Sequence, residues 1–281
     1  MNTYEFRLDP AEDVPPTTVV IGPALYRFAA RRADESRLAG EPSQDYLALR
    51  ADEAGASFCI CDGVSLSFFG GLAARLLGDA LLEWCANGIS TEAEEQEVRL
   101  SLARLLMELT HTAGEEVRNH PLPPMAAGLL REVLEDKRLL GSEAMFVCGR
   151  IDLPNTAFPA GRLVLGCLGD IRLRFVSTDG RWEPPPAGSS TRQRWSTRRG
   201  VVGGRPAVLI SELPATAAGL TVYTDGLAAY CEGVTNLPPE GPDPLRICWE
   251  EGDYPADDDQ LYFQVQWRSG QPPNDREEAS S

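Results

Sequence analysis

The order of apolar and polar positions along the chain predicts a β-rich start, a helical middle and a β-rich end. Residues 17–30 are β-branched and aromatic on both sides of Gly22-Pro23, which predicts two short strands around a turn. Two more strands are predicted at 45–50 and 56–61, because both runs favour strands and the stretch ADEAG between them is typical of a turn. The residues up to about 16 show no such pattern, so we expect them to be loosely ordered.

The middle of the chain predicts three helices. The first covers 69–85, where apolar residues recur at four-residue steps. The second opens with a capping box made by Thr91 and Glu94 and runs to about residue 112. The third covers 124–140 and stops at Gly141. The positions predicted to face the core are Leu72, Leu76, Ala80 and Trp84 in the first helix and Leu100, Leu102, Leu105, Leu106 and Leu109 in the second.

The rest of the chain returns to a strand pattern. Strands, then helices, then strands, with no linker between two cores, predict a single α+β domain over 1–268. The segment 182–205 is rich in Pro, Ser and Arg, and the polar tail 269–281 is expected to be disordered. The strands of this part are predicted at 144–153, 162–167, 171–177, 207–210, 220–224 and 260–267.

The balance of charge narrows the class of partner. The chain of 281 residues has 42 acidic against 26 basic side chains, a formal net charge of −16. This excess of negative charge argues against nucleic acid or an anionic membrane as the main partner. No run of 18 apolar residues is present, and the first residues lack the basic start and apolar core of a signal peptide. We therefore expect a cytoplasmic protein.

Seven cysteines lie mostly within apolar segments. An odd number of cysteines in a chain without a signal peptide favours reduced thiols over disulfides. Cys59 and Cys61 resemble a soft-metal pair, but no second cysteine pair follows, and alternation places both on one face of a buried strand. We therefore expect core packing. The seven are Cys59, Cys61, Cys85, Cys148, Cys167, Cys231 and Cys248.

Four short segments carry an aspartate at the edge of an apolar run that favours a strand. A strand end holds a carboxylate rigidly and leaves its oxygens at the rim of the sheet. Converging carboxylates repel one another unless cations neutralise them, and hard cations such as Mg²⁺ and Mn²⁺ prefer oxygen ligands. The sequence therefore predicts a divalent-metal site assembled from distant strands, of the kind that serves phosphoryl chemistry. The four aspartates are Asp62, Asp170, Asp225 and Asp258.

These aspartates belong to five ordered elements between residues 36 and 267. The elements are Gly40–Asp45 (GEPSQD), Phe58–Val64 (FCICDGV) with the helix after it, Val164–Arg172 (VLGCLGDIR), Val222–Leu227 (VYTDGL) and Asp257–Val265 (DDDQLYFQV). In order, spacing and flanking strands they resemble the metal-dependent protein phosphatase family, also called the protein phosphatase 2C family, including its bacterial branch. The resemblance implies a four-layer α-β-β-α sandwich, in which two antiparallel sheets are flanked by helices.

The resemblance also implies a serine/threonine protein phosphatase that needs Mn²⁺ or Mg²⁺, in which a water bridging two metal ions attacks the phosphorus. In this family pattern Asp62 bridges the two ions and the carbonyl of Gly63 binds the second. Asp225 and Asp258 bind the first ion, and Asp170 matches the position that holds a weaker third. The triple Asp257-Asp258-Asp259 leaves the register open by one residue; Asp258 aligns best.

Two residues near Asp45 depart from the family pattern. Gln44 stands where many relatives have a Glu that contacts metal-bound water, which leaves Asp45 as a weaker metal ligand or as a residue that orients water or caps the strand. Gly40 stands where many relatives have an Arg that grips the phosphate. Arg37, in a neighbouring turn, is a candidate replacement.

A cluster of arginines lies between the Gly-Asp and Thr-Asp-Gly elements, where the family places its variable flap. One interpretation is recognition of phosphate or of acidic residues around it, since Arg offers bidentate contacts. The other is a solvated loop that compensates local acidity. The arginines are Arg192, Arg194, Arg198 and Arg199.

The leading hypothesis is therefore a bacterial phosphoprotein phosphatase that acts in signal transduction opposite a serine/threonine kinase, expected to be a monomer. Two alternatives stay open. One is a catalytically weak or inactive pseudophosphatase that binds phosphoproteins, and the other is a phosphatase of a small molecule. His111 and His120 match no family motif and are expected to take no part in catalysis.

Overall fold

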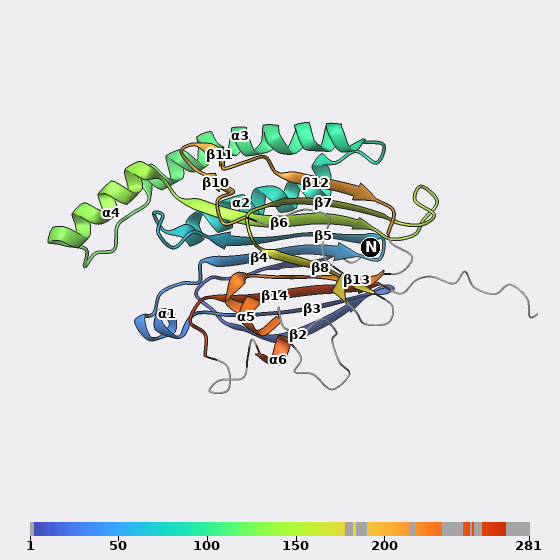
Figure 1. Cartoon of the computed structure of the whole chain (residues 1–281), viewed down its shortest axis with the longest axis horizontal. Coiled ribbons are helices and arrows are strands. Elements are labelled where there is room, and N and C mark those ends of the chain that lie inside the picture. Colours follow the sequence, from blue (N-terminus) through green and yellow to red (C-terminus); the bar gives the residue numbers. More distant parts are fainter. Residues whose placement is uncertain are drawn as a thin grey trace, which may run out of the picture.

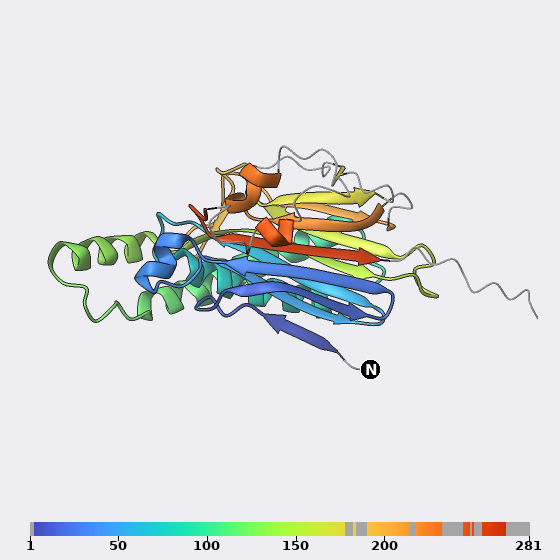
Figure 2. The same ribbon diagram turned by 90° about the horizontal axis from the view of Figure 1, so that it is seen from below.

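The computed structural model describes residues 3–177, 182–183, 190–213, 217–231, 244–247, 249 and 255–267. Two antiparallel sheets pack face to face, and helices lie outside them, as Figures 1 and 2 show. The core fills the space between the sheets; the rings of Phe58 and Phe263, one from each sheet, have centroids 5.0 Å apart. The predicted α+β sandwich is confirmed.

The larger sheet has eight strands in the described part of the chain. Its order begins β1-β4-β5-β6. Beyond β6, β7 pairs with most of the length of β6 and β12 pairs with β7, while the hairpin of β10 and β11 pairs with the start of β6. The strands are β1 (Tyr4–Arg7), β4 (Asp45–Asp52), β5 (Gly55–Gly63), β6 (Glu143–Asp152), β7 (Arg162–Leu168), β10 (Arg194–Ser196), β11 (Gly200–Val202) and β12 (Ala207–Ser211).

The smaller sheet has the order β2-β3-β14-β13-β8-β9. Its strands are β2 (Val14–Ile21), β3 (Ala24–Arg31), β8 (Arg172–Ser177), β9 (Trp182–Glu183), β13 (Ala217–Tyr223) and β14 (Gln260–Trp267). The hairpin predicted around Gly22-Pro23 is confirmed as β2 and β3, and the strands predicted between 45 and 61 and between 144 and 267 are confirmed with small shifts at their ends.

The two long helices α2 and α3 cover the outer face of the larger sheet, and α4 extends beyond its edge (Figure 1). On the other side of the sandwich, α5 and α6 pack onto the smaller sheet through a second apolar cluster that includes Leu227, Leu245 and Tyr262. No helix in the described ranges is long and apolar enough to span a membrane. The helices are α1 (Asp34–Ala39), α2 (Gly70–Glu83), α3 (Glu95–Asn119), α4 (Gly128–Leu140), α5 (Ala228–Cys231) and α6 (Pro244–Ile247), with a π-turn at Trp84–Gly88 and a 3₁₀ turn, η2, at Asp225–Leu227.

The buried stripe of α2 is offset from the predicted one. Leu72 and Trp84 are buried as expected, but Leu76 and Ala80 are only half-buried. The offset follows from the small residues of the helix, since a Cβ at Gly78 would lie 2.4 Å from a ring carbon of Tyr46. The sheet approaches this small-residue face most closely. The helix therefore buries Ala73, Ala74, Leu77, Gly78, Leu81 and Leu82.

The second predicted helix begins later and ends later than expected. Glu94 is its N-cap and forms the capping box with Glu97, so the box predicted at Thr91 is wrong. Leu102 and Leu106 are buried and Leu105 and Leu109 pack partly, whereas Leu100 is 57% exposed and does not face the core. The third helix also begins later, at Gly128 instead of 124, and ends before Gly141 as predicted.

The start of the chain is ordered, so the expectation of a loose segment up to residue 16 is wrong for β1 and for the first residues of β2. Tyr4 and Phe6 pack against the core, while Arg7 forms an ion pair of 2.6 Å with Asp79. This alternation of apolar and polar residues is that of a half-buried edge strand, but four residues are too few to stand out in the sequence. The predicted tail 269–281 lies outside the described residues.

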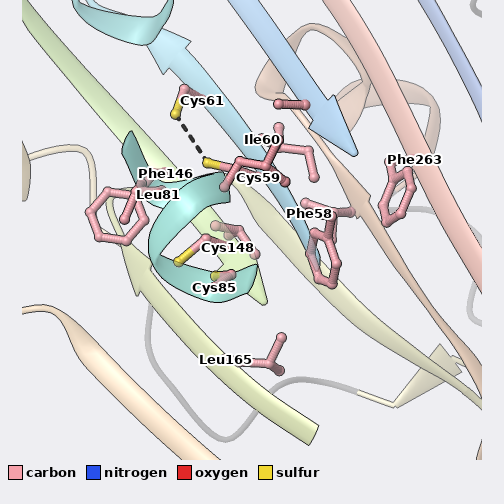
Figure 3. Close-up of a cluster of buried hydrophobic side chains, with 14 of the residues drawn as sticks. Phe58, Cys59, Ile60, Cys61, Leu81, Cys85, Phe146, Cys148, Leu165 and Phe263 are labelled. Carbon is pink, nitrogen blue, oxygen red and sulfur yellow. Dashed lines mark hydrogen bonds between the residues drawn. The ribbon is translucent and has the colours of Figure 1, made fainter. Parts of the chain in front are cut away.

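Cys59 and Cys61 lie in the core as expected; Cys85, Cys148 and Cys231 are also buried, whereas Cys167 is half-buried. Cys59 and Cys61 are fully buried with their sulfurs 3.4 Å apart, and Figure 3 shows them with Cys85 and Cys148 among aromatic and aliphatic side chains. Burial raises the pKa of Cys59 and Cys148 well above its usual value, so both stay as neutral thiols. None of the six cysteines of the described ranges is joined to another of them by a disulfide, and Cys248 lies outside these ranges.

Candidate metal centre

The candidate centre begins with two aspartates that face each other on neighbouring strands. Asp45 opens β4 and is directly opposite Asp62 near the end of β5. Asp45 is buried and Asp62 is half-buried. Two carboxylates in adjacent strand positions repel each other, so this pairing at the end of the larger sheet calls for a neutralising partner.

The smaller sheet brings three further aspartates to the same end of the sandwich. Arg172 on β8 pairs with Tyr223 on β13, and Tyr223 pairs with Tyr262 on β14, which defines one row across the sheet. Beyond that row lie Asp170, in the turn between β7 and β8, and Asp225, which follows β13. Asp258, two residues before β14, completes the set.

The electrostatic environment shows that these carboxylates converge. Burial raises the pKa of Asp62 well above its usual value, and the charges of Asp225, Asp170 and Asp258 raise it further. Burial also raises the pKa of Asp225, with Asp170 as the next cause. The pKa of Asp258 is raised by burial, while the backbone N–H of Asp259 opposes the shift. The four aspartates predicted from the sequence therefore share one local field.

Asp45 also links the two sheets. Its Oδ2 accepts a hydrogen bond of 2.7 Å from the hydroxyl of Thr224, and that hydroxyl accepts one of 3.0 Å from the N–H of Leu261. Burial raises the pKa of Asp45 well above its usual value, with Asp62 and then Asp259 as the next causes. Thr224 lies directly before Asp225, so this bond fixes the position of the rim aspartate relative to the larger sheet.

The structure separates the members of the aspartate triple. Asp259 is buried, and its two carboxylate oxygens accept the N–H groups of Ala33 (2.8 Å) and Gln44 (2.6 Å). Asp258 is exposed at the rim, and among the described residues only the N–H of Asp259 donates to it, at 2.8 Å. Asp259 therefore holds the backbone around the centre, and Asp258 keeps an oxygen available for a ligand. Asp259 was not among the predicted site residues. Its place in a run of three aspartates gave no sign that it would accept hydrogen bonds from the backbone.

The donor set fits hard divalent cations. All the converging side chains are carboxylates, and Oδ1 of Asp170 is buried without a hydrogen-bond partner. Among the residues that the structure describes, no group of three Asp, Glu, His or Cys side chains has the geometry of a complete metal-binding site. The carboxylates of Asp225, Asp170 and Asp258 lie near enough to raise the pKa of Asp62, and joint coordination of one ion would need adjustment of their side chains.

Gly63 allows the close packing beside Asp62. A Cβ at this position would lie 2.3 Å from the carbonyl carbon of Gly70, at the start of α2. The N–H of Gly63 donates to the carbonyl of Gln44 at 3.1 Å, so the residue is held against both β4 and α2. The Asp-Gly dipeptide is therefore needed for the approach of the helix, in addition to any part its carbonyl takes in metal binding.

Arg37 and Arg172 differ in their relation to the centre. Arg37 lies in α1, where its Nε is 3.1 Å from Asp13 and its Nη1 is 3.8 Å from Asp34. Arg172 lies within the row described above; its Nη1 donates to the carbonyl of Asp170 at 2.5 Å, and its charge lowers the pKa of Asp225. The cation that acts on the cluster is therefore Arg172, which the sequence signalled only as the last residue of the Gly-Asp-Ile-Arg turn.

The predicted arginine flap is in part a hairpin of the larger sheet. Arg194 and Arg199 each form an ion pair of 2.5 Å with Glu143, and Arg198 donates to the carbonyl of Leu139. Arg192 is exposed, two residues after Ser190, whose N–H donates to the carbonyl of Gly169 at 2.9 Å. The segment thus runs from the Asp170 turn to the start of β6, next to Gly63. Residues 184–189 of the segment rich in Pro, Ser and Arg, 182–205, lie outside the described ranges.

The two histidines lie on α3 and at its end. His111 lines a cavity of that helix, and the ring of His120 contacts Phe68 and Phe69 edge-on. Burial lowers the pKa of His120, and the positive charge of Arg138 lowers it further. Neither histidine is among the causes of the pKa shifts of Asp45, Asp62, Asp225 and Asp258 named above, and their having no part in catalysis stays a prediction.

Comparison with solved structures identifies the fold. A bacterial serine phosphatase superposes with a TM-score of 0.55 over 88% of this chain and 99% of its own, at 12% identity. The serine/threonine phosphatase Stp1 from Staphylococcus aureus gives 0.56 over 92% and 98%, also at 12% identity. RsbX, crystallised in complex with magnesium, gives 0.50 over 90% and 100%, at 12% identity. No protein-family model matches the sequence, and no curated protein matches it significantly.

These matches define the class of fold. The chain has the fold of the serine/threonine phosphatases of the protein phosphatase 2C type, so the resemblance seen in its sequence elements is confirmed at the level of the fold. At 12% identity the likeness establishes the fold alone, and the chemistry has to be argued from the residues of this chain.

Proposed function

We propose that the chain is a metal-dependent phosphatase that hydrolyses phosphoserine and phosphothreonine in proteins. The observation that carries the proposal is the convergence of Asp62, Asp170, Asp225 and Asp258 from both sheets. Burial raises the pKa of Asp62, Asp225 and Asp258, and the charge of Asp170 adds to the shifts of Asp62 and Asp225. A fold shared with solved serine/threonine phosphatases supports the same reaction class.

The residues that would hold Mn²⁺ or Mg²⁺ follow from this arrangement. Two ions would be held by Asp62, the carbonyl of Gly63, Asp225 and Asp258, with Asp170 available for a third. When bound, such cations supply a water acidic enough to attack phosphorus at neutral pH and offset the charge of the phosphoryl group. Asp45, buried behind Asp62 and bonded to Thr224, takes a supporting role in orienting its neighbours.

Arg172 is the residue that we propose for the phosphate oxygens. Its guanidinium is positioned by the carbonyl of Asp170 and acts electrostatically on Asp225. A guanidinium in this position can stabilise negative charge on a phosphoryl oxygen, the task that an Arg at position 40 performs in many relatives. Arg37 is the weaker candidate, because Asp13 and Asp34 already pair with it.

The substrate is proposed to be a phosphorylated protein from an opposing serine/threonine kinase, met by a monomer in the bacterial cytoplasm. Arg192, exposed on the segment that leaves the Asp170 turn, is placed to contact acidic residues around the phosphate. Arg194 and Arg199 would act less directly, because Glu143 neutralises both and uses them to hold the hairpin.

The test is hydrolysis of p-nitrophenyl phosphate and of a phosphothreonine peptide, with and without Mn²⁺. We expect turnover that needs the metal and that falls by about 100-fold or more in Asp225→Asn, since the variant removes a proposed ligand. Asp136→Asn, an exposed aspartate on α4, is the matched control and should leave the rate unchanged. Absence of turnover from folded protein at every metal concentration would contradict the proposal and point to a phosphoprotein-binding module.

A further inference from the structure

A cavity away from the aspartates is lined by three arginines. It has a volume of about 470 Å³ and lies between α3, α4 and the turn that follows β10. Arg118, Arg138 and Arg198 contribute to its lining, together with apolar side chains of Met107, Val117 and Leu139. Three guanidinium groups around one cavity are notable in a chain with a net charge of −16. The volume is within the range of cavities that hold small ligands.

The positive charge of this cavity is only partly balanced. Arg118 lies 3.9 Å from Glu115, and both side chains are about two-thirds exposed, so that pair is weak. Arg138 pairs with Glu135 at 3.1 Å, but its Nε is buried without a hydrogen-bond partner.

Arg198 lacks a balancing charge. Its guanidinium donates to the carbonyl of Leu139, and no carboxylate of the described residues pairs with it. The cavity therefore keeps excess positive charge, which suits an anionic ligand.

The wall opposite α3 is held in a fixed position. A Cβ at Gly114 would lie 2.8 Å from the carbonyl oxygen of Thr197, so only a glycine lets this segment pack so closely on the helix. Gly141 has a φ of +93°, which favours glycine, and a Cβ at this residue would lie 3.0 Å from the hydroxyl oxygen of Thr197. The arginines on either side are thus carried by packed backbone instead of a loose loop.

We propose that this cavity binds a small organic phosphate, with the phosphate between the guanidinium groups and an apolar group against Met107, Val117 and Leu139. Arg presents paired donors that match the oxygens of a phosphate, and a dianion gains more from three arginines than a carboxylate does. The inference rests on the cavity and its charge and does not depend on the proposed phosphatase activity.

The cavity is connected to the loop that follows Asp62 and Gly63. The carbonyl of Gly141 accepts the N–H of Phe68 at 3.2 Å, and the guanidinium of Arg138 lies over the Phe68 ring, 5.2 Å from its centroid. Ser142 donates from its hydroxyl to the carbonyl of Phe69 at 2.9 Å and from its N–H to the hydroxyl of Thr197 at 3.0 Å. A ligand that fixes Arg138 and Thr197 would therefore also restrict the segment 64–70, which joins β5 to α2.

The test is calorimetric titration of the metal-free full chain with phenylphosphonate, in the presence of EDTA. Without metal, the aspartate centre repels a phosphonate, so binding reports on the cavity. We expect saturable one-site binding that weakens about tenfold in Arg198→Gln and in Arg118→Gln, since each removes a charged contact. Arg131→Gln, on the same helix as Arg138 but outside the cavity, should bind as the wild type does. No saturable binding, or equal binding by all four proteins, would overturn the proposal.

Hydrogen exchange read by mass spectrometry on the same samples tests the connection. Phenylphosphonate should slow exchange in peptides covering residues 64–70 of the wild type and leave Arg198→Gln unchanged at the same concentration. Binding without any change of exchange in this segment would show that the cavity is not coupled to the loop. Benzenesulfonate, a monoanion of similar shape, serves as the control for the charge of the ligand.

Discussion

Each aspartate of the centre has a different local environment, and that difference separates its function from those of its neighbours. Asp259 has both oxygens occupied by backbone N–H groups, and Asp45 is bonded to Thr224, so these two stabilise the framework. Asp225 and Asp258 are exposed at the rim, where a ligand can reach them. Residues that hold the site and residues proposed to contact a ligand are thus adjacent in sequence. For this reason the roles within a run of three aspartates cannot be told apart from the sequence alone.

At the residue scale, the account predicts that Arg172→Gln reduces turnover. The guanidinium supplies charge-assisted hydrogen bonds to phosphoryl oxygens, and we expect kcat/KM for p-nitrophenyl phosphate to fall by about 10- to 100-fold with Mn²⁺ present. Arg174→Gln, two residues further along the same strand, is the matched control and should change kcat/KM less than about twofold, as expected of a residue outside the site. Equal losses in both variants would show that the effect is on strand stability and not on the phosphate.

At the element scale, the ends of strands and helices determine where the chemistry lies. The aspartate motifs could be placed from the sequence because each one follows or precedes a clear apolar run, and all five aspartates lie at or next to the end of a strand. The start of α3 could not be placed from the sequence, because Thr91 and Glu94 both offer N-cap side chains and only tertiary packing decides between them. The hairpin of β10 and β11 was missed for a similar reason: its strands have three residues each and gain their stability from pairing with β6.

The corrected helix start gives a direct prediction. Glu94→Ala removes the N-cap and half of the capping box of α3, so the free energy of unfolding should fall by about 1 kcal/mol. Thr91→Ala should change it by less than about 0.5 kcal/mol, as for a surface residue without a special contact. Urea unfolding of both variants beside the wild type checks this. A larger loss of unfolding free energy for Thr91→Ala than for Glu94→Ala would contradict this start and favour the start predicted at Thr91.

At the scale of the whole molecule, the sandwich brings together carboxylates that are separated by nearly 200 residues. The strand pattern predicted an α+β domain, and the family resemblance implied its two sheets. The pairing of Asp45 with Asp62 and the hydrogen bond from Thr224 to Asp45 depend on strand register and on the packing of one sheet against the other. The same packing makes the metal-free centre a source of instability, because it holds buried carboxylates near one another.

The metal-free protein should therefore show a specific dependence of stability on pH. The folded-state pKa of Asp45 and Asp62 lies well above the ordinary value of 3.8, so the folded chain binds more protons than the unfolded chain above that pH. Their contribution is favourable at low pH and is lost as pH rises through the folded pKa values.

Urea unfolding midpoints, measured in EDTA at a series of pH values from about 4 upward, check the sign of this pH dependence. Asp45→Asn, which cannot ionise, should lose stability less steeply with rising pH than the wild type does. Parallel curves for the two proteins would contradict the shift assigned to Asp45. Carboxylates with a lowered pKa, such as Asp13 and Asp34, act in the opposite direction at lower pH and are common to both proteins.

The central claim is that the converging aspartates form a divalent-cation centre, and calorimetric titration of the metal-free protein with Mn²⁺ tests it most directly. We predict saturable binding of about two ions by the wild type, accompanied by proton release, since raised pKa values mean that carboxyl protons must leave. Asp62→Asn should lose most of this binding while remaining folded, and Asp136→Asn should keep it. Mn²⁺ binding that is absent from the wild type, or unchanged in Asp62→Asn, would contradict the account.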